Sequence, residues 1–341
     1  MKSINTVPAR PRACWEEAVA RVGWNFLDPL AASPAFIDRS TRIAVAGGTF
    51  AGQMAELIAQ AGYSVYATEP RPEGQPFFSA AYGAIYTPEQ LRQLMARAFG
   101  EPEAAGSAEA IWEYRESPVF LDAFRPTAGR PCGDAQQVSA DRKAHLAKVR
   151  ELVQGAEVFF ISLEQSEAWV ARDGGLVFPL PPMVLKKSYD PHDFIPHNFS
   201  AAEMADSLRG FMEMVRGVNA GLKIILAVSP IPILMTSGPE HVLVANGYAK
   251  SALRAAAEEI GRQYPGVFYF PALEVITGSY AAAHFFQDDL RSISPGGLKW
   301  LFHLFLRHFT VAGAPEDQTG GEETLSIPED ICDDGIVELS R

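Results

Sequence analysis

Two glycines and a threonine, Gly47, Gly48 and Thr49, form the stretch of this chain with the clearest capacity for chemistry. They end a short apolar run, residues 43–47, and a helical spacing of apolar residues begins directly after them. In open α/β sheets, ligands bind outside the carboxyl ends of the strands. The backbone N–H groups of Gly48, Thr49 and Phe50 can therefore bind an anion or a carbonyl oxygen at a helix N-terminus.

The Thr49 hydroxyl has two possible roles at this turn. It could act as a nucleophile, which requires a base within hydrogen-bond reach. It could instead hydrogen-bond the turn or cap the helix that follows.

Two carboxylates, Glu164 and Glu167, follow a second apolar run at residues 158–162, so we expect them at the same crevice. Glu164 could be a general base if burial raised its pKa, or it could fill the site. For Glu167 a structural role near Trp169 is favoured.

Further polar and aromatic residues fall in the loops of this predicted crevice. Ser229 ends the apolar run 222–228 and precedes a rigid proline-containing loop, and Arg254 could hold an acidic substrate or pair with a core carboxylate. Tyr82 and Tyr86 could stack on sugar rings or simply cover the end of the sheet. The spacing of His192 and His197 beside a proline lacks the ligand geometry of a metal site, so no metal is expected.

The elements that must position these residues alternate between strand and helix along the chain. This order predicts an α/β fold: a doubly wound, mostly parallel, five-stranded sheet in a three-layer sandwich. The predicted strands are 43–47, 64–68, 158–162, 222–228 and 267–270. The predicted helices begin near residues 52, 88, 139, 201, 244 and 295.

Length and charge divide the 341 residues into three parts: an N-terminal arm at 1–40, the α/β domain at 41–312 and an acidic tail at 313–341, expected to be weakly ordered. Nine of the acidic residues lie in the tail, in a chain of net charge −12. This acidity argues against nucleic acid or an anionic membrane as partner, whereas the tail could bind a protein.

Composition also limits the compartment and the cofactors. Cys14, Cys132 and Cys332 are far apart, which argues against a disulfide framework and fits a reducing cytoplasm. We see no apolar run of a signal peptide or of a membrane span, so a cytoplasmic protein without cofactor is expected. The sequence leaves the oligomeric state open.

The order of motifs resembles the GSCFA domain family, which is related to the SGNH (GDSL-like) hydrolases, over roughly residues 20–310. The family's Gly-Ser-Cys-Phe-Ala motif stands here as Gly47-Gly48-Thr49-Phe50-Ala51. Later blocks agree in order: Tyr82-Gly83-Ala84-Ile85-Tyr86-Thr87, Glu164-Gln165-Ser166-Glu167-Ala168-Trp169, Val228-Ser229-Pro230-Ile231-Pro232, Asn246, Lys250-Ser251, Leu253-Arg254, Tyr269-Phe270-Pro271, Glu274 and Asp289-Leu290-Arg291-Ser292. The resemblance implies an SGNH/flavodoxin-like fold and an ancestral activity of O-acyl ester hydrolysis or transfer on a glycan, in bacteria.

The departures from the family pattern fall on the residues that would carry this activity. Aligned to the GSCFA motif, the resemblance implies a serine where Gly48 stands. Aligned to the GDSL motif, it implies the nucleophile at Thr49. It implies an oxyanion-hole asparagine at Ala84, a glycine at Glu164 and a base histidine at Ser292. Because that base is missing, the structural role of Thr49 is favoured.

The closing block keeps an acidic residue where the resemblance implies the triad acid. Asp289 could serve as that acid or pair with Arg291, which could itself contact substrate. Three hypotheses follow: an esterase with an altered triad, with Thr49, Glu164 and Asp289 as the candidate catalytic residues; a catalytically inactive relative that binds a glycan, a small acid or a protein; or a different chemistry that uses Glu164 with Asp289. His241 and His284, in nearby loops, could replace the missing base, although an ordinary surface role is favoured for both.

Overall fold

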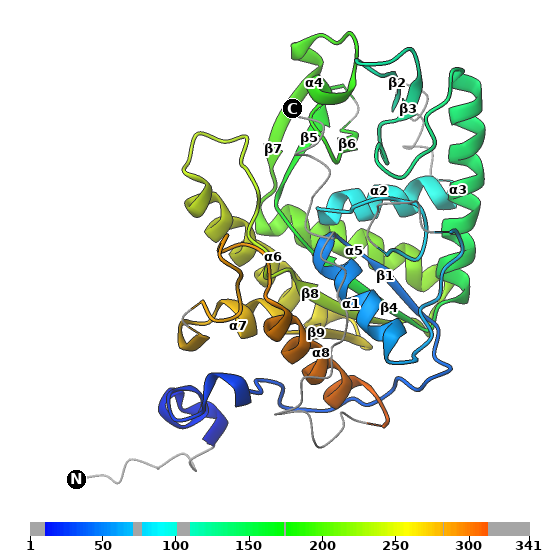
Figure 1. Ribbon diagram of the computed structural model, residues 1–341. Helices are drawn as coiled ribbons and strands as arrows, with labels where there is room; N and C mark the ends of the chain where they lie inside the picture. The colour runs from blue at the N-terminus through cyan, green and yellow to red at the C-terminus, as the bar shows by residue number, and fades with distance from the viewer. Residues whose placement is uncertain (1–10, 71–76, 101–109, 174, 282, 313–341) are drawn as a thin grey trace.

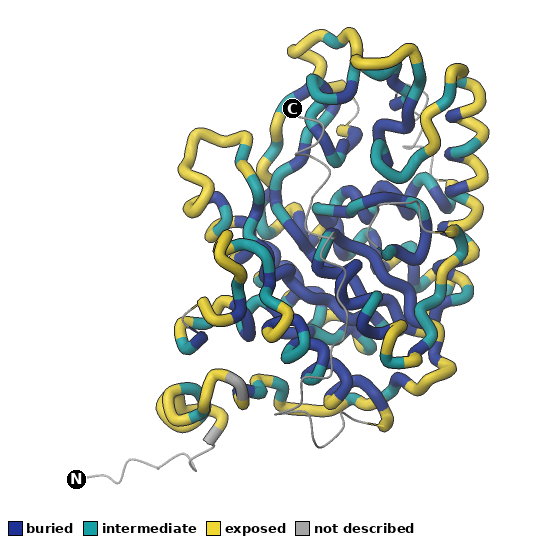
Figure 2. Tube along the Cα trace, in the orientation of Figure 1, coloured by how far each residue is buried: buried dark blue, intermediate teal, exposed yellow. Residues whose placement is uncertain are grey.

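A four-stranded parallel sheet forms the centre of the computed structural model, which describes residues 11–70, 77–100, 110–173, 175–281 and 283–312. The strand order is β1 (Ile43–Ala46), β4 (Val158–Leu163), β8 (Lys223–Val228) and β9 (Val267–Phe270) (Figure 1). Nearly every residue of β1, β4 and β8 is buried, as expected for strands covered on both faces (Figure 2).

The prediction of a fifth strand at 64–68 is wrong. The chain there makes one parallel bridge, between Ile43 and Val65. Beyond it the hydrogen-bonding groups of β1 are taken by another loop: the Val45 N–H donates to Ser79 Oγ at 2.8 Å, and the Ser79 N–H donates to the Val45 carbonyl at 3.2 Å. Because these groups are occupied, the ladder of a fifth strand cannot extend along β1.

Helices cover both faces of the sheet, and two neighbouring residues of β4 show the layering. Phe159 packs its ring against Phe211, whereas Phe160 packs against Phe50 and Phe305. Adjacent residues of a strand point to opposite faces. The helices α1 (Thr49–Gln60), α7 (Ala272–Thr277) and α8 (Pro295–Phe309) therefore lie on one face, and α2 (Pro88–Phe99), α3 (Ala135–Gly155), α5 (Ala201–Val218) and α6 (Val242–Gln263) group on the other side.

Local signals explain where several helices begin. The capping box of Ser200 and Glu203 forms as the sequence predicts, and Ser294 caps α8 with Pro295 at its first turn. The helix α3 begins at Ala135, earlier than predicted, because Asp134 accepts the Gln136 N–H and serves as N-cap. The helix α1 begins at Thr49 rather than at residue 52.

Smaller antiparallel elements lie above the carboxyl ends of the parallel strands and were not predicted (Figure 1). They share a separate apolar cluster in which Trp112 and Phe178 pack 4.8 Å apart. These elements are the pair β2 (Ile111–Glu113) and β3 (Phe120–Asp122), the sheet β6–β5–β7 (Val177–Phe178, Glu167–Ala171, Phe194–Asn198) and the short helix α4 (Pro182–Leu185). Strands this short carry little period-2 signal.

The described part of the N-terminal arm lies against the core through aromatic residues. Phe36 packs on Phe268 and Phe309, and Ile37 forms a parallel bridge with Thr310. Trp24 stacks on His284 at 5.1 Å. The helical turns of the arm span Pro11–Ala13, Glu16–Ala20 and Trp24–Phe26; two others span Pro191–Asp193 and Ser279–Ala281. The acidic tail and Cys332 fall outside the described residues.

Candidate functional site

The turn between β1 and α1 requires glycine at its first position. Gly47 has a φ of +144°, a region that L side chains rarely adopt. A Cβ there would also lie 2.8 Å from both the Cβ and the carbonyl oxygen of Ser162. Close packing of the turn on β4 thus fixes the backbone of the predicted crevice.

A carboxylate lies against Gly48, the second residue of the turn. The Gly48 N–H donates to Glu164 Oε1 at 3.0 Å, and Ser162 Oγ donates to the same oxygen at 2.6 Å. The Glu164 residue is only 9% exposed. A Cβ on Gly48 would lie 2.9 Å from Glu164 Cδ, so the carboxylate fills the space beside this backbone donor.

The backbone of Glu164 is fixed from two other elements. Its N–H donates to the Tyr86 carbonyl at 3.2 Å, and its carbonyl accepts from Lys250 Nζ at 2.7 Å. Lys250 is a buried residue of α6. Sequence reasoning gave Lys250 no role, although a lysine that lies among the buried residues of a helix signals a polar partner.

Gly48, rather than Thr49, is the N-cap of α1, so the alternative in which Thr49 caps this helix is wrong, and the alternative in which its hydroxyl bonds the turn stays a prediction. Thr49 is the first helical residue and is partly buried. Ser229 is fully buried: its N–H donates to the Leu163 carbonyl at 2.9 Å, and its Oγ accepts the Ile231 N–H at 3.3 Å. These two bonds fix the loop that follows β8.

The closing block forms a compact turn around Asp289. Its carboxylate accepts from Ser292 Oγ at 2.6 Å and from the backbone N–H groups of Ser292 and Arg291 at 2.8 and 2.9 Å. Although burial raises the pKa of Asp289, these hydrogen bonds hold it below its ordinary value. Arg291 Nε donates to the Pro232 carbonyl at 3.0 Å, which ties this turn to the loop after β8.

Arg254 and Glu167 make contacts within the fold. Arg254 pairs with Glu274 at 2.8 Å and with Glu258 at 2.9 Å. Glu167 accepts from Thr236 Oγ1 at 2.6 Å and from the Ser237 N–H at 2.8 Å. The contacts of Glu167 agree with the structural role favoured for it. The partners of Arg254 are partly exposed rather than core carboxylates, and its substrate role stays a prediction.

The two tyrosines differ in accessibility. Tyr82 is 3% exposed and its hydroxyl donates to the Val45 carbonyl, while burial raises the pKa of the phenol. The expectation that Tyr82 offers a face for sugar stacking is therefore wrong, because the ring covers the edge of β1. Tyr86 is half-buried, and its carbonyl accepts the N–H groups of Glu164 and Gln165.

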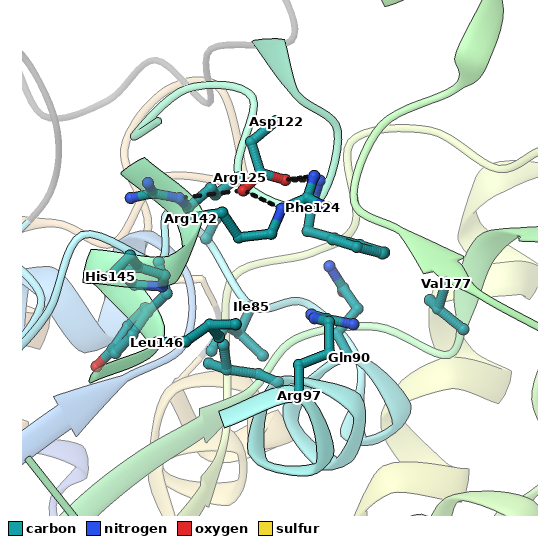
Figure 3. Close-up of a pocket in the computed structure, with 13 residues that line it drawn as sticks. Ile85, Gln90, Arg97, Asp122, Phe124, Arg125, Arg142, His145, Leu146 and Val177 are labelled. Carbon is teal, nitrogen blue, oxygen red and sulfur yellow. Dashed lines mark hydrogen bonds and ion pairs between the residues drawn. The ribbon is translucent and has the colours of Figure 1, made fainter. Parts of the chain in front are cut away.

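Behind the loop of Tyr82 lies a charged cavity of about 20 Å³ that sequence reasoning missed (Figure 3). The residues that line it include Arg97 of α2, Asp122 of β3, Arg125, and Arg142 and His145 of α3. Ala84, at the position where the resemblance implies an asparagine, also lines it. The i, i+3 spacing of an arginine and a histidine on one face of a predicted helix was the signal that could have found it.

A network of carboxylates and guanidinium groups organises one wall of this cavity. Asp122 accepts from Arg142 at 2.7 and 2.9 Å and from Arg125 at 3.3 Å, and Arg125 also pairs with Asp141. Although burial raises the pKa of Asp122, the hydrogen bonds and charge of Arg142 hold it below its ordinary value. Asp122 is thus ionised near neutral pH, and both of its oxygens are occupied.

The comparisons with known proteins give one family. The model of the GSCFA family matches residues 42–305, which is most of the chain. No curated protein matches the chain. Within the described ranges, no cluster of three or more His, Cys, Asp or Glu side chains could hold a metal ion, and each helix is too short or too polar to cross a bilayer.

Proposed function

Since the chain belongs to the GSCFA family, we propose that it is a ligand-binding relative of the SGNH hydrolases in which the ester-hydrolysis site is closed. The observation that carries this proposal is the hydrogen bond of 3.0 Å from the Gly48 N–H to Glu164 Oε1. An oxyanion hole works when its donors are aimed at the position where charge develops in the transition state. Here the protein's own carboxylate holds one such donor.

Two departures from the family pattern are neighbours in space, which supports closure rather than random loss. The resemblance implies a side chain at position 48 and none at position 164. In this chain Gly48 has no side chain, and the Glu164 carboxylate lies against it. A Cβ added at Gly48 would be only 2.9 Å from Glu164 Cδ. A substrate ester would have to displace an anion that accepts two hydrogen bonds.

A ligand-binding role requires a crevice with a fixed backbone. The Gly47 turn and the Lys250 contact hold the crevice in shape. The ligands that the sequence leaves open are a glycan, a small acid and a protein partner.

A second candidate is an esterase with an altered triad. The observation in its favour is that Glu164 and Thr49 flank the same residue, Gly48, so a carboxylate and a hydroxyl lie at one turn. In this route Glu164 would act as base for Thr49 and Asp289 would support the site from the closing turn.

Hydrolysis of 4-nitrophenyl acetate separates the two functions. We expect the wild-type chain, Thr49→Ala and Glu164→Gly to leave the buffer rate unchanged. Thr277→Ala, at an exposed threonine of α7, is the matched control. A wild-type rate above buffer that disappears in Thr49→Ala but persists in Thr277→Ala would refute the ligand-binding proposal and establish the esterase.

A further inference from the structure

A buried histidine near the end of α8 binds the N-terminal arm through both of its ring nitrogens. His308 is 4% exposed, and its Nε2 lies 2.9 and 2.8 Å from the two carboxylate oxygens of Asp28. A carboxylate accepts hydrogen bonds, so Nε2 carries the proton and donates. In the neutral ring, Nδ1 then accepts from Ser33 Oγ at 2.8 Å. Two side chains of the arm are thus bound to one residue of the core.

The backbone of the arm extends this attachment. The Ala35 N–H donates to the His308 carbonyl at 3.0 Å. The N–H groups of Phe36 and Ile37 donate to the Phe309 carbonyl at 3.0 and 2.9 Å. The end of α8 therefore anchors the arm through main chain and side chains together, where the arm passes below α8 in Figure 1.

Trp24, which lies earlier in the arm, contacts the segment of chain that precedes α8. Its ring stacks on His284 at 5.1 Å and meets Phe285 edge-on at 5.3 Å. Phe285 is 2% exposed and packs at the start of α8, since a Cβ added at Gly297 would lie 3.0 Å from its Cβ and its carbonyl oxygen. Gly297 and His308 are separated by about 16 Å at the helical rise of about 1.5 Å per residue. The arm is therefore held at two places that lie toward opposite ends of α8.

At the first of these places the arm reaches the base of a hairpin, residues 285–294, which carries the closing turn at its tip. Phe286 forms an antiparallel bridge with Ile293, and the Asp289 turn lies between them. Arg291 ties this tip to the loop that follows β8. The base of the hairpin, which the arm contacts, is thus connected to an edge of the crevice.

We propose that the arm is a strap that holds this hairpin in place, and that His308 is the positioning residue that fastens the strap. Residues 287–290 of the hairpin are exposed, and segments with few buried contacts open locally at low free energy. The strap adds a contact at the base through Trp24, and the bonds of His308 to Asp28 and Ser33 keep that contact in place. This inference goes beyond the proposed function and does not rest on it.

Amide hydrogen exchange of the full chain, followed by mass spectrometry, tests the strap. Asp28→Ala removes the fastening from a distance, because the hydrogen-bond and ion-pair partners of Asp28 in the described chain all lie in the arm or near the end of α8. We expect exchange in residues 285–294 to be faster by roughly tenfold or more, because hydrogen bonds to a charged group are lost. Glu17→Ala removes another carboxylate of the arm, one that pairs with Arg21, and should leave this exchange unchanged.

Two further variants separate a strap from a general loss of stability. Trp24→Ala should speed exchange in the hairpin while residues 35–37 keep the wild-type rate, because the fastening is intact. Asp28→Asn keeps an acceptor for the His308 Nε2 proton and should have a smaller effect than Asp28→Ala. In every variant β4 and β8 should exchange as in wild type.

Two outcomes would overturn the strap. One is an unchanged exchange rate of the hairpin in Asp28→Ala or in Trp24→Ala. The other is an equal acceleration in the hairpin, β4 and β8, which would mean that the substitution lowers the stability of the whole fold. None of these measurements uses an ester substrate, so the strap and the proposed function fail separately.

Discussion

The contact between position 48 and Glu164 makes a prediction about how two substitutions combine. Gly48→Ser restores the residue that the family resemblance implies at the turn, and Glu164→Gly restores the one it implies after β4. In the wild-type background the new Cβ would lie 2.9 Å from Glu164 Cδ and 3.2 Å from Oε1. Atoms at that separation must move apart, so the two substitutions cannot act independently.

The expected free energies of unfolding follow from these contacts. Gly48→Ser inserts a side chain into filled space and should destabilise by about 1–3 kcal/mol. Glu164→Gly removes an acceptor from the Gly48 N–H and from Ser162 Oγ, which should cost about 2–4 kcal/mol. In the double variant the overlap is absent, so destabilisation should fall short of the sum by about 1–2 kcal/mol.

Urea unfolding of wild type, both single variants and the double variant measures this coupling. Gly247→Ser is the matched control, because a Cβ at this exposed position of α6 meets nothing within 4 Å. Its effect should add to that of Glu164→Gly. If the Gly48 and Glu164 substitutions add to within about 0.5 kcal/mol, the idea that the carboxylate replaces the missing side chain is wrong.

Two further predictions concern buried charges. Asp122→Asn should destabilise the fold by about 3–5 kcal/mol at neutral pH, because Arg142 and Arg125 lose their counter-ion. Since the Asp122 pKa is held below its ordinary value in the folded state, this contribution is present above about pH 4 and disappears as pH falls through the folded-state pKa. Urea unfolding at decreasing pH should therefore bring the stabilities of wild type and variant together. Lys250→Met should cost about 1–3 kcal/mol by leaving the buried Glu164 carbonyl without this donor, whereas Lys143→Met on the surface should change urea stability little.

The sequence predicted the core of the fold because long-range burial leaves a local pattern. Apolar runs at β4 and β8 are read directly as buried strands, and the Ser200–Glu203 box marks the start of α5. The predicted strand at 64–68 failed for a reason outside its own residues. Its place along β1 is taken by Ser79 and Tyr82, from a loop whose composition carries no strand signal.

The candidate site shows the same contrast between local sequence signals and contacts made by distant residues. Glu164 was identified because it follows a strand, and the sequence already allowed that it fills the crevice, but its bonds to Gly48 and Ser162 depend on the approach of β4 to β1. The cavity of Arg97 and His145 was missed because its walls come from α2, α3 and the β2–β3 pair. No single stretch of sequence brings these residues together.

One loop, residues 84–86, contacts both parts of the site: the turn at Gly48 and the charged cavity. The Ile85 N–H donates to the Gly47 carbonyl at 2.9 Å, and the Tyr86 carbonyl accepts the Glu164 N–H, so residues 85–86 are held to the turn. Ala84 and Ile85 also line the cavity, at the place where the resemblance implies an oxyanion-hole asparagine. A carboxylate of the chain therefore fills the turn on one side of this loop, and on the other side the Asp122 carboxylate pairs with Arg142 and Arg125 at the cavity. This arrangement favours binding over hydrolysis, because the backbone donor at Gly48 is already taken by Glu164.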